Sequence, residues 1–81
     1  MSTVWVRSFI IPPDRGETFS PGVPFTIDIP ENLTLGQLAN RILSKNIEQL
    51  GIMAVNGRIG CENPILSEGD KIDLFAFVDG G

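Results

Sequence analysis

One helical stripe of apolar residues, lying between segments that alternate in apolar character, is the feature that most restricts the fold. Leu35, Leu38, Ala39, Ile42 and Leu43 recur at spacings of three, four and seven, which is typical of one buried helix face. Residues 23–29 and 71–78 alternate as half-buried strands do. Because one stripe can cover one face of one sheet, the 81 residues are expected to form a single core.

The first two strands are predicted at residues 3–11 and 23–29, with a loop at residues 14–22 between them. Prolines 12 and 13 end the first strand because proline cannot donate a ladder hydrogen bond. Alternation sends Val4, Val6 and Ile10 to one face and Trp5, Arg7 and Phe9 to the other. The second strand is predicted to direct Val23, Phe25, Ile27 and Ile29 inward, and the outward Pro24 indicates an edge strand.

The helix is predicted to begin at a capping box formed by Thr34 and Gln37. We expect it to run to about Lys45 or Asn46, with a connector over residues 47–51. Gly36 is a weak helix former within the first turn and raises the hypothesis of a close approach by another backbone.

The C-terminal part is predicted to contain short strands and turns. Residues 52–55 form an apolar strand, Asn56 and Gly57 form a turn, and a second short strand lies near Ile59. We expect Ile65 and Leu66 to contact the core from a loop, and residues 68–70 to turn into the last strand, 71–78. That strand is predicted to send Ile72, Leu74, Ala76 and Val78 to one face and Lys71, Asp73, Phe75 and Phe77 to the other.

The order of these elements predicts an α+β fold of the β-grasp (ubiquitin-like) type. It has a mixed sheet of four to five strands with one main helix on one face. The first and last strands can pair in parallel because the helix-bearing middle of the chain supplies the crossover. The predicted domain covers residues 1–78, and residues 79–81 are predicted to form a flexible C-terminal tail.

The composition argues against catalysis by this chain alone. It has no histidine, so it lacks the usual proton shuttle near neutral pH, and its one cysteine cannot form a zinc site without histidine. Its glycines match neither of the phosphate-binding motifs GxxxxGK[ST] and GxGxxG. We therefore expect no bound cofactor, no metal and no enzyme activity of its own, and we interpret Cys61 as a structural or incidental thiol.

Charge and hydropathy limit the expected partners and compartment. Ten acidic residues stand against six scattered basic residues, which gives a net charge of −4 and no basic cluster for nucleic acid. The charge favours either docking on a basic protein surface or simple solubility. No apolar run suits a membrane span or a leader, and one cysteine fits a reducing compartment, so we expect a cytoplasmic protein.

The tail Asp79-Gly80-Gly81 is the predicted reactive segment. Glycine has no Cβ, so Gly80 and Gly81 can lie in a channel too narrow for other residues. Three extended residues carry the Gly81 carboxylate roughly 10 Å from the body. A partner enzyme would have to activate this carboxylate, for example by adenylation with ATP, because a carboxylate has a poor leaving group.

Outward aromatic side chains on the first and last strands form a predicted docking patch of Trp5, Phe9, Phe75 and Phe77. An apolar patch on a solvated face often marks a protein interface. The alternative is that the loop over residues 12–22 covers some of these rings.

The sequence resembles the ubiquitin-like sulfur carriers (the MoaD/ThiS family), most closely the small subunit of molybdopterin synthase. The residues that carry the resemblance are Ala54-Val55-Asn56-Gly57, residues 64–72, Phe75 and Val78-Asp79-Gly80-Gly81. The resemblance implies that an E1-like adenylyltransferase uses ATP to activate Gly81, which is then converted to a thiocarboxylate. It also implies that the sulfur passes to an acceptor such as the large subunit of molybdopterin synthase, with Phe75 and Phe9 in the docking surface.

Three alternatives remain open at the level of sequence. The chain can serve a thiamine-type or tungsten-cofactor pathway as a sulfur carrier. It can instead be a ubiquitin-like modifier joined through Gly81 to lysines of target proteins, since both functions need a free Gly-Gly end. The third alternative is a passive β-grasp binding module.

Overall fold

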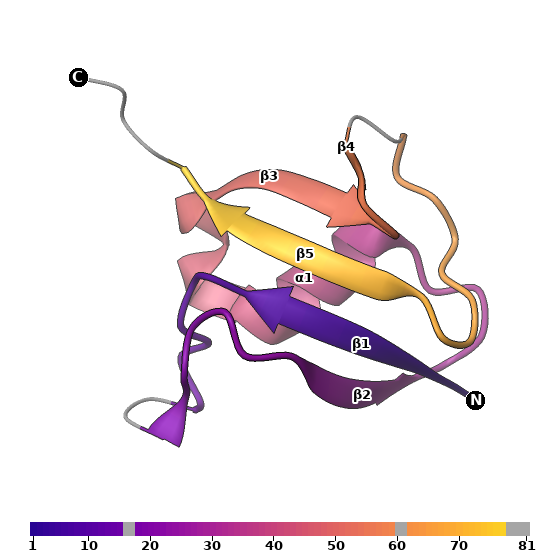
Figure 1. Cartoon of the computed structure of the whole chain (residues 1–81), viewed down its shortest axis with the longest axis horizontal. Coiled ribbons are helices and arrows are strands. Elements are labelled where there is room, and N and C mark those ends of the chain that lie inside the picture. The colour runs from indigo at the N-terminus through magenta and orange to yellow at the C-terminus, as the bar shows by residue number, and fades with distance from the viewer. Residues whose placement is uncertain (16–17, 60–61, 78–81) are drawn as a thin grey trace.

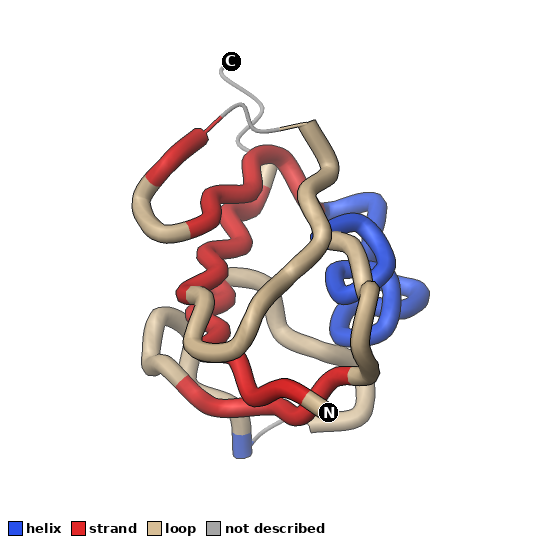
Figure 2. The backbone as a smooth tube through the Cα atoms, turned by 90° about the vertical axis from the view of Figure 1, so that its right-hand side faces the viewer, coloured by secondary structure: helices blue, strands red, loops and turns tan. Residues whose placement is uncertain are grey.

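The computed structural model describes residues 1–15, 18–59 and 62–77. Its strands are β1 (Ser2–Ser8), β2 (Phe25–Ile29), β3 (Leu50–Val55), β4 (Arg58–Ile59) and β5 (Lys71–Ala76), which form one five-stranded sheet in the order β2-β1-β5-β3-β4 (Figure 1). The helices α1 (Leu35–Leu43) and η2 (Ser44–Gln49, a 3₁₀ helix) lie together on one side of this sheet (Figure 2). The predicted α+β fold, with a mixed sheet and one main helix, is confirmed.

The central pair of the sheet is β1 and β5, which run parallel with Val6 opposite Ile72. All other pairings are antiparallel: β1 with β2, β3 with β5, and β3 with β4. The parallel pair joins the two ends of the domain, as predicted from the helix-bearing crossover between them.

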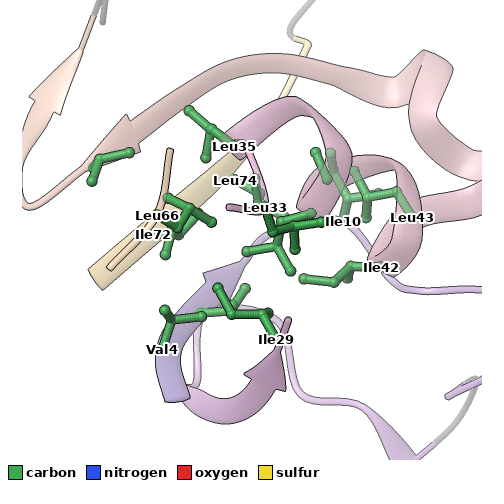
Figure 3. Packing of buried hydrophobic residues seen from close by; sticks show 14 residues of the cluster. Val4, Ile10, Ile29, Leu33, Leu35, Ile42, Leu43, Leu66, Ile72 and Leu74 are labelled. Atoms are coloured by element: carbon green, nitrogen blue, oxygen red, sulfur yellow. The ribbon is translucent and has the colours of Figure 1, made fainter. Parts of the chain in front are cut away.

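The core lies between the inward sheet face and α1. Strand residues such as Val4, Ile72 and Leu74 point toward the helix, and Leu43 of the helix points back toward them (Figure 3). The buried members of this cluster are Val4, Val6, Ile10, Ile29, Leu33, Leu35, Leu38, Ala39, Ile42, Leu43, Val55, Leu66, Ile72 and Leu74. The predicted inward faces of the helix and of the first strand are therefore confirmed.

Strand β1 ends earlier than predicted, at Ser8 rather than residue 11. The buried Ser8 hydroxyl donates to the Ile10 carbonyl at 2.7 Å and accepts from the Ile10 amide at 3.1 Å, which folds the chain into a local turn. Ile10 nevertheless stays in the core, with 2% of its surface exposed.

Strand β2 begins at Phe25, and the prediction that it starts at Val23 with an inward side chain is wrong. Val23 is exposed, and its amide donates to the Ser20 carbonyl in a turn at 3.2 Å. Ladder pairing starts where Phe25 faces Val6. The predicted edge position is confirmed because β2 pairs only with β1.

Helix α1 begins as predicted and ends sooner. Both hydrogen bonds of the capping box are present, from the Gln37 amide to the Thr34 hydroxyl and from the Thr34 amide to the Gln37 side chain. The helix stops at Leu43 because Ser44 takes a positive φ of 47°. The predicted connector at residues 47–51 is instead the end of η2 and the start of β3, and the Asn46 side chain ties η2 to the Ile11 carbonyl at 2.8 Å.

Gly36 meets a side chain rather than another backbone. Its amide donates to the Asn63 side-chain oxygen at 2.7 Å, and a Cβ on Gly36 would lie 2.9 Å from that oxygen. The loop before β5 is thus held against the first turn of the helix.

The predicted turn at Asn56 and Gly57 is confirmed, with φ values of 53° and 82°. The Asn56 side chain accepts from the Lys71 amide at 3.0 Å and donates to Asp70 at 3.1 Å, which joins this turn to the start of β5. Leu66 is buried as predicted, whereas the core contact predicted for Ile65 is wrong because its side chain is exposed.

Strand β5 ends at Ala76, before the predicted end at residue 78, and Ala76 is exposed rather than buried. Val78 lies outside the described residues, as do Cys61 and the predicted tail, residues 79–81. The domain boundary placed after residue 78 therefore stays a prediction.

Candidate functional site

The outward face of the sheet, away from α1, carries a stacked aromatic pair. The rings of Phe9 and Phe75 are parallel within 11°, with centroids 5.3 Å apart. The parallel alignment of β1 and β5 brings them together, and the Phe9 amide donates to the Leu74 carbonyl at 2.9 Å. Phe9 remains 42% exposed, so the pair presents apolar surface to solvent.

Arg7 and Asp73 lie beside this pair on the same face. The Arg7 guanidinium donates to the Asp73 carboxylate at 2.9 Å, and its carbon lies 5.6 Å from the centroid of the Phe9 ring. The two opposite charges are therefore matched within the face, and the aliphatic stem and flat head of Arg7 extend the surface beside Phe9. Arg7 was assigned to the outward face from sequence, but its contacts with Asp73 and Phe9 were not predicted.

The other two predicted aromatics lie at the ends of the face. Trp5 is aligned with Lys71 at the start of β5 and is 46% exposed, and Arg7 and Asp73 separate it from the stacked pair. Phe77 follows the end of β5 and is 68% exposed. The structure thus brings Phe9 and Phe75 into contact and places Trp5 apart from them.

The loop before β2 covers one edge of Phe9, so the alternative that the loop covers the patch holds in part. The Gly22 amide donates to the Ser8 carbonyl at 2.9 Å, and a Cβ on Gly22 would lie 3.0 Å from the Phe9 ring. Gly22 also has a φ of 82°, a conformation that favours glycine. The loop supports the ring from the side and leaves much of it exposed.

Ile52 and Ile59 extend the outward apolar surface and were not predicted to belong to it. Ile52 faces Phe75 across β3 and β5 and is 49% exposed. Ile59 faces Ala54 across β3 and β4 and is 66% exposed, and Ala54 in turn faces Asp73 of the outward face. Residues directly opposite each other in a sheet share a face. The face of Ile52 follows from the antiparallel pairing of β3 with β5, which was not predicted from the sequence.

We define the docking surface as Phe9, Phe75, Ile52, Ile59 and Phe77. Trp5 lines a separate open depression with Arg7, Pro24, Asn56, Gly57, Lys71 and Asp73. No group of three or more His, Cys, Asp or Glu side chains suited to a metal ion occurs among the described residues. An exposed apolar surface of this kind is typical of protein interfaces.

The C-terminal end of β5 lies beside the docking surface. The Phe77 amide donates to the Gln49 carbonyl at 2.7 Å, so one residue beyond β5 the chain is still bonded to the end of η2, immediately before β3. The predicted reactive residues Asp79, Gly80 and Gly81 follow directly in sequence and lie outside the described residues.

A protein-family model described as the ThiS family matches residues 19–81. This chain belongs to the ThiS family. The family's members are small sulfur carriers without catalytic activity of their own, which generally work with E1-like activating enzymes and sulfur-accepting enzymes. The resemblance to ubiquitin-like sulfur carriers is thereby confirmed for the family, while its molybdopterin branch stays a prediction.

Among solved structures, the ThiS-family chain is similar to Caldiarchaeum subterraneum ubiquitin. The TM-score is 0.62 at 15% sequence identity, and the match covers 99% of this chain and 98% of the other. At this identity the likeness shows the ubiquitin-like fold alone. No curated protein sequence matches the chain, and no helix in the described ranges has the length and apolar character to cross a membrane.

Proposed function

We propose that this sulfur carrier acts through the carboxylate of Gly81. An E1-like adenylyltransferase docks on the docking surface and uses ATP to activate that carboxylate. The observation that carries the proposal is the family match, which continues through Gly81.

The proposed activation of Gly81 consists of two nucleophilic substitution reactions. A Gly81 carboxylate oxygen attacks the α-phosphorus of ATP, and pyrophosphate leaves. A hydrosulfide-level sulfur nucleophile then attacks the acyl carbon, and AMP leaves with that oxygen. The product is a C-terminal thiocarboxylate. No oxidation or reduction is required, because the incoming sulfur already has the oxidation state of hydrosulfide.

The geometry supports docking and reaction at one end of the molecule. Phe75 is stacked on Phe9, and two residues later Phe77 is hydrogen-bonded to Gln49. Residues 78–81, if extended, span about 13–14 Å. A partner that covers the aromatic pair would therefore have the reactive end within reach of a nearby active site.

We further propose that the large subunit of molybdopterin synthase accepts the sulfur. Phe75 in β5 and Phe77 just after it support this branch over shorter thiamine-type carriers. A thiamine-type or tungsten-cofactor pathway would use the same activated end, so the identity of the acceptor separates these alternatives.

The test is ATP–pyrophosphate exchange with the E1-like adenylyltransferase of the same cells. The wild-type carrier is expected to support exchange, and a variant lacking Gly80 and Gly81 is expected to lose it while keeping its thermal unfolding profile. Equal exchange by the two proteins would overturn the proposal.

The ubiquitin-like modifier is distinguished by a separate outcome. A modifier would leave Gly-Gly remnants on lysines of other proteins after protease digestion, because Gly81 would be joined to them through an isopeptide bond. A carrier transfers sulfur and leaves no such remnants.

A further inference from the structure

Gly51 lies at the start of β3, beside the end of β5. The pairing of β3 with β5 shifts between Leu50 and Ile52: Leu50 faces Ala76, whereas Ile52 faces Phe75. Gly51 is therefore the extra residue of a β-bulge, a feature that bends a strand and often redirects the chain at a functional site.

The reason for glycine at this position is a close backbone approach. A Cβ on Gly51 would lie 2.7 Å from the Phe77 Cα, 3.0 Å from the Phe77 nitrogen and 3.2 Å from the Ala76 carbonyl oxygen. These atoms belong to the backbone, so no side-chain rotation can relieve the contact. Its φ is not among the positive values, which leaves space rather than conformation as the reason.

The same approach allows the last described hydrogen bond of the chain. With Gly51 in place, the Phe77 amide reaches the Gln49 carbonyl at 2.7 Å. Gln49 at the end of η2 and Gly51 at the start of β3 thus hold Phe77, immediately before the segment that ends in Gly81.

We infer that Gly51 is a positioning residue for the reactive C-terminus. By admitting the Phe77 backbone, it fixes where residues 78–81 leave the domain relative to the docking surface. This inference rests on the proposed function, because a fixed exit matters when a docked partner must receive the Gly81 carboxylate.

Amide hydrogen exchange of the isolated carrier directly tests whether Gly51 fixes the Phe77 backbone, from which residues 78–81 continue. In Gly51→Ala the exchange rate of the Phe77 amide, divided by that of the Phe9 amide, is expected to rise at least about tenfold, because the added Cβ displaces the Phe77 backbone. The Phe9 amide donates to Leu74 inside the sheet and corrects for any change in global stability. An unchanged ratio would overturn the inference.

Gly69→Ala is the matched control. Gly69 has a φ of 83°, and a Cβ there would meet nothing within 4 Å, so alanine adds backbone strain without touching Phe77. The exchange ratio is expected to stay at the wild-type value in this variant. A rise equal to that of Gly51→Ala would show that the effect is not specific to position 51 and would contradict the inference.

The functional consequence is a split between kcat and KM in ATP–pyrophosphate exchange. Gly51→Ala is expected to lower kcat at least about tenfold relative to Gly69→Ala, with a smaller change in KM, because the docking surface other than Phe77 is kept while the Gly81 carboxylate is misplaced. Equal kcat values for the two variants would refute the positioning role. If the wild-type carrier supports no exchange, the proposed function fails, and the hydrogen-exchange ratio still decides whether Gly51 sets the exit.

A second pair of variants covers the case in which Gly51→Ala does not fold. Phe77→Pro removes both the ring and the N–H donor, whereas Phe77→Ala removes the ring and keeps the donor. The proline variant is expected to show the lower kcat. Identical kcat values would count against the role of the Gln49–Phe77 hydrogen bond.

Discussion

At the scale of single residues, the stacked pair of Phe9 and Phe75 is the most specific feature of the outward face. Truncation of Phe75 to alanine is expected to weaken binding to the adenylyltransferase at least about tenfold, or about 1.4 kcal/mol, because buried aromatic anchors dominate interfaces. Isothermal titration measures the change. Ile65→Ala is the control, since Ile65 is 59% exposed and pairs with Thr34, the N-cap of α1. Equal losses in the two variants would contradict the assignment.

Ser44 has a strained backbone conformation, and glycine at this position would relieve the strain. Its φ of 47° and ψ of −120° are unfavourable for a residue with a Cβ. Ser44→Gly is therefore expected to raise the free energy of unfolding by about 0.5–1 kcal/mol, measured as a higher urea midpoint with an unchanged m-value. The neighbouring Lys45→Gly is expected to lower it, and stabilisation by both substitutions would argue against relief of strain at Ser44.

At the scale of elements, the N-terminus of α1 depends on one reciprocal pair of hydrogen bonds. Thr34→Ala removes the hydroxyl that accepts from the Gln37 amide at 3.2 Å and is expected to reduce stability by about 1 kcal/mol. Thr34→Ser keeps the acceptor and is expected to stay near the wild-type value. Urea unfolding compares the three proteins, and an alanine variant as stable as the serine variant would refute the capping role.

The sequence predicted elements well where a periodic pattern and a local signal agreed. The stripe from Leu35 to Leu43, with Thr34 as its cap, marked the helix start correctly because both signals depend on near neighbours in the chain. The helix end was missed because Ser44 adopts a positive φ in its tertiary setting. Composition does not encode such a conformation, since serine rarely takes it.

Long-range pairing explains what remained unpredicted in the site. Phe9 and Phe75 were assigned to the outward face from alternation alone, yet their stacking requires the parallel alignment of β1 with β5. Ile52 was missed because an apolar run of four residues gives no face until its partner strand is known. The role of Gly51 is invisible in sequence for the same reason, because its neighbour Phe77 lies far along the chain.

At the scale of the whole molecule, the outward face of the sheet carries the docking surface, and the end of β5 lies beside it. The helix layer covers the inward face of the sheet, which leaves the outward face free for a partner (Figure 2). The charges of Arg7 and Asp73 lie within that face and cancel each other. The net charge of −4 therefore comes entirely from other residues of the chain. We therefore expect added salt to change the association rate with the partner more than the dissociation rate, which stopped-flow and dissociation measurements separate; a dissociation rate that changes as strongly would contradict this expectation.

The central claim is that the protein works through an activated acyl group at Gly81. The most direct test is the intact mass of the protein isolated from the cells that make it, with fragmentation to locate any change. We predict a population that ends at Gly81 and carries one sulfur in place of one terminal oxygen. A mature chain that continues beyond Gly81, or one whose terminus never acquires sulfur while the pathway is active, would contradict the account.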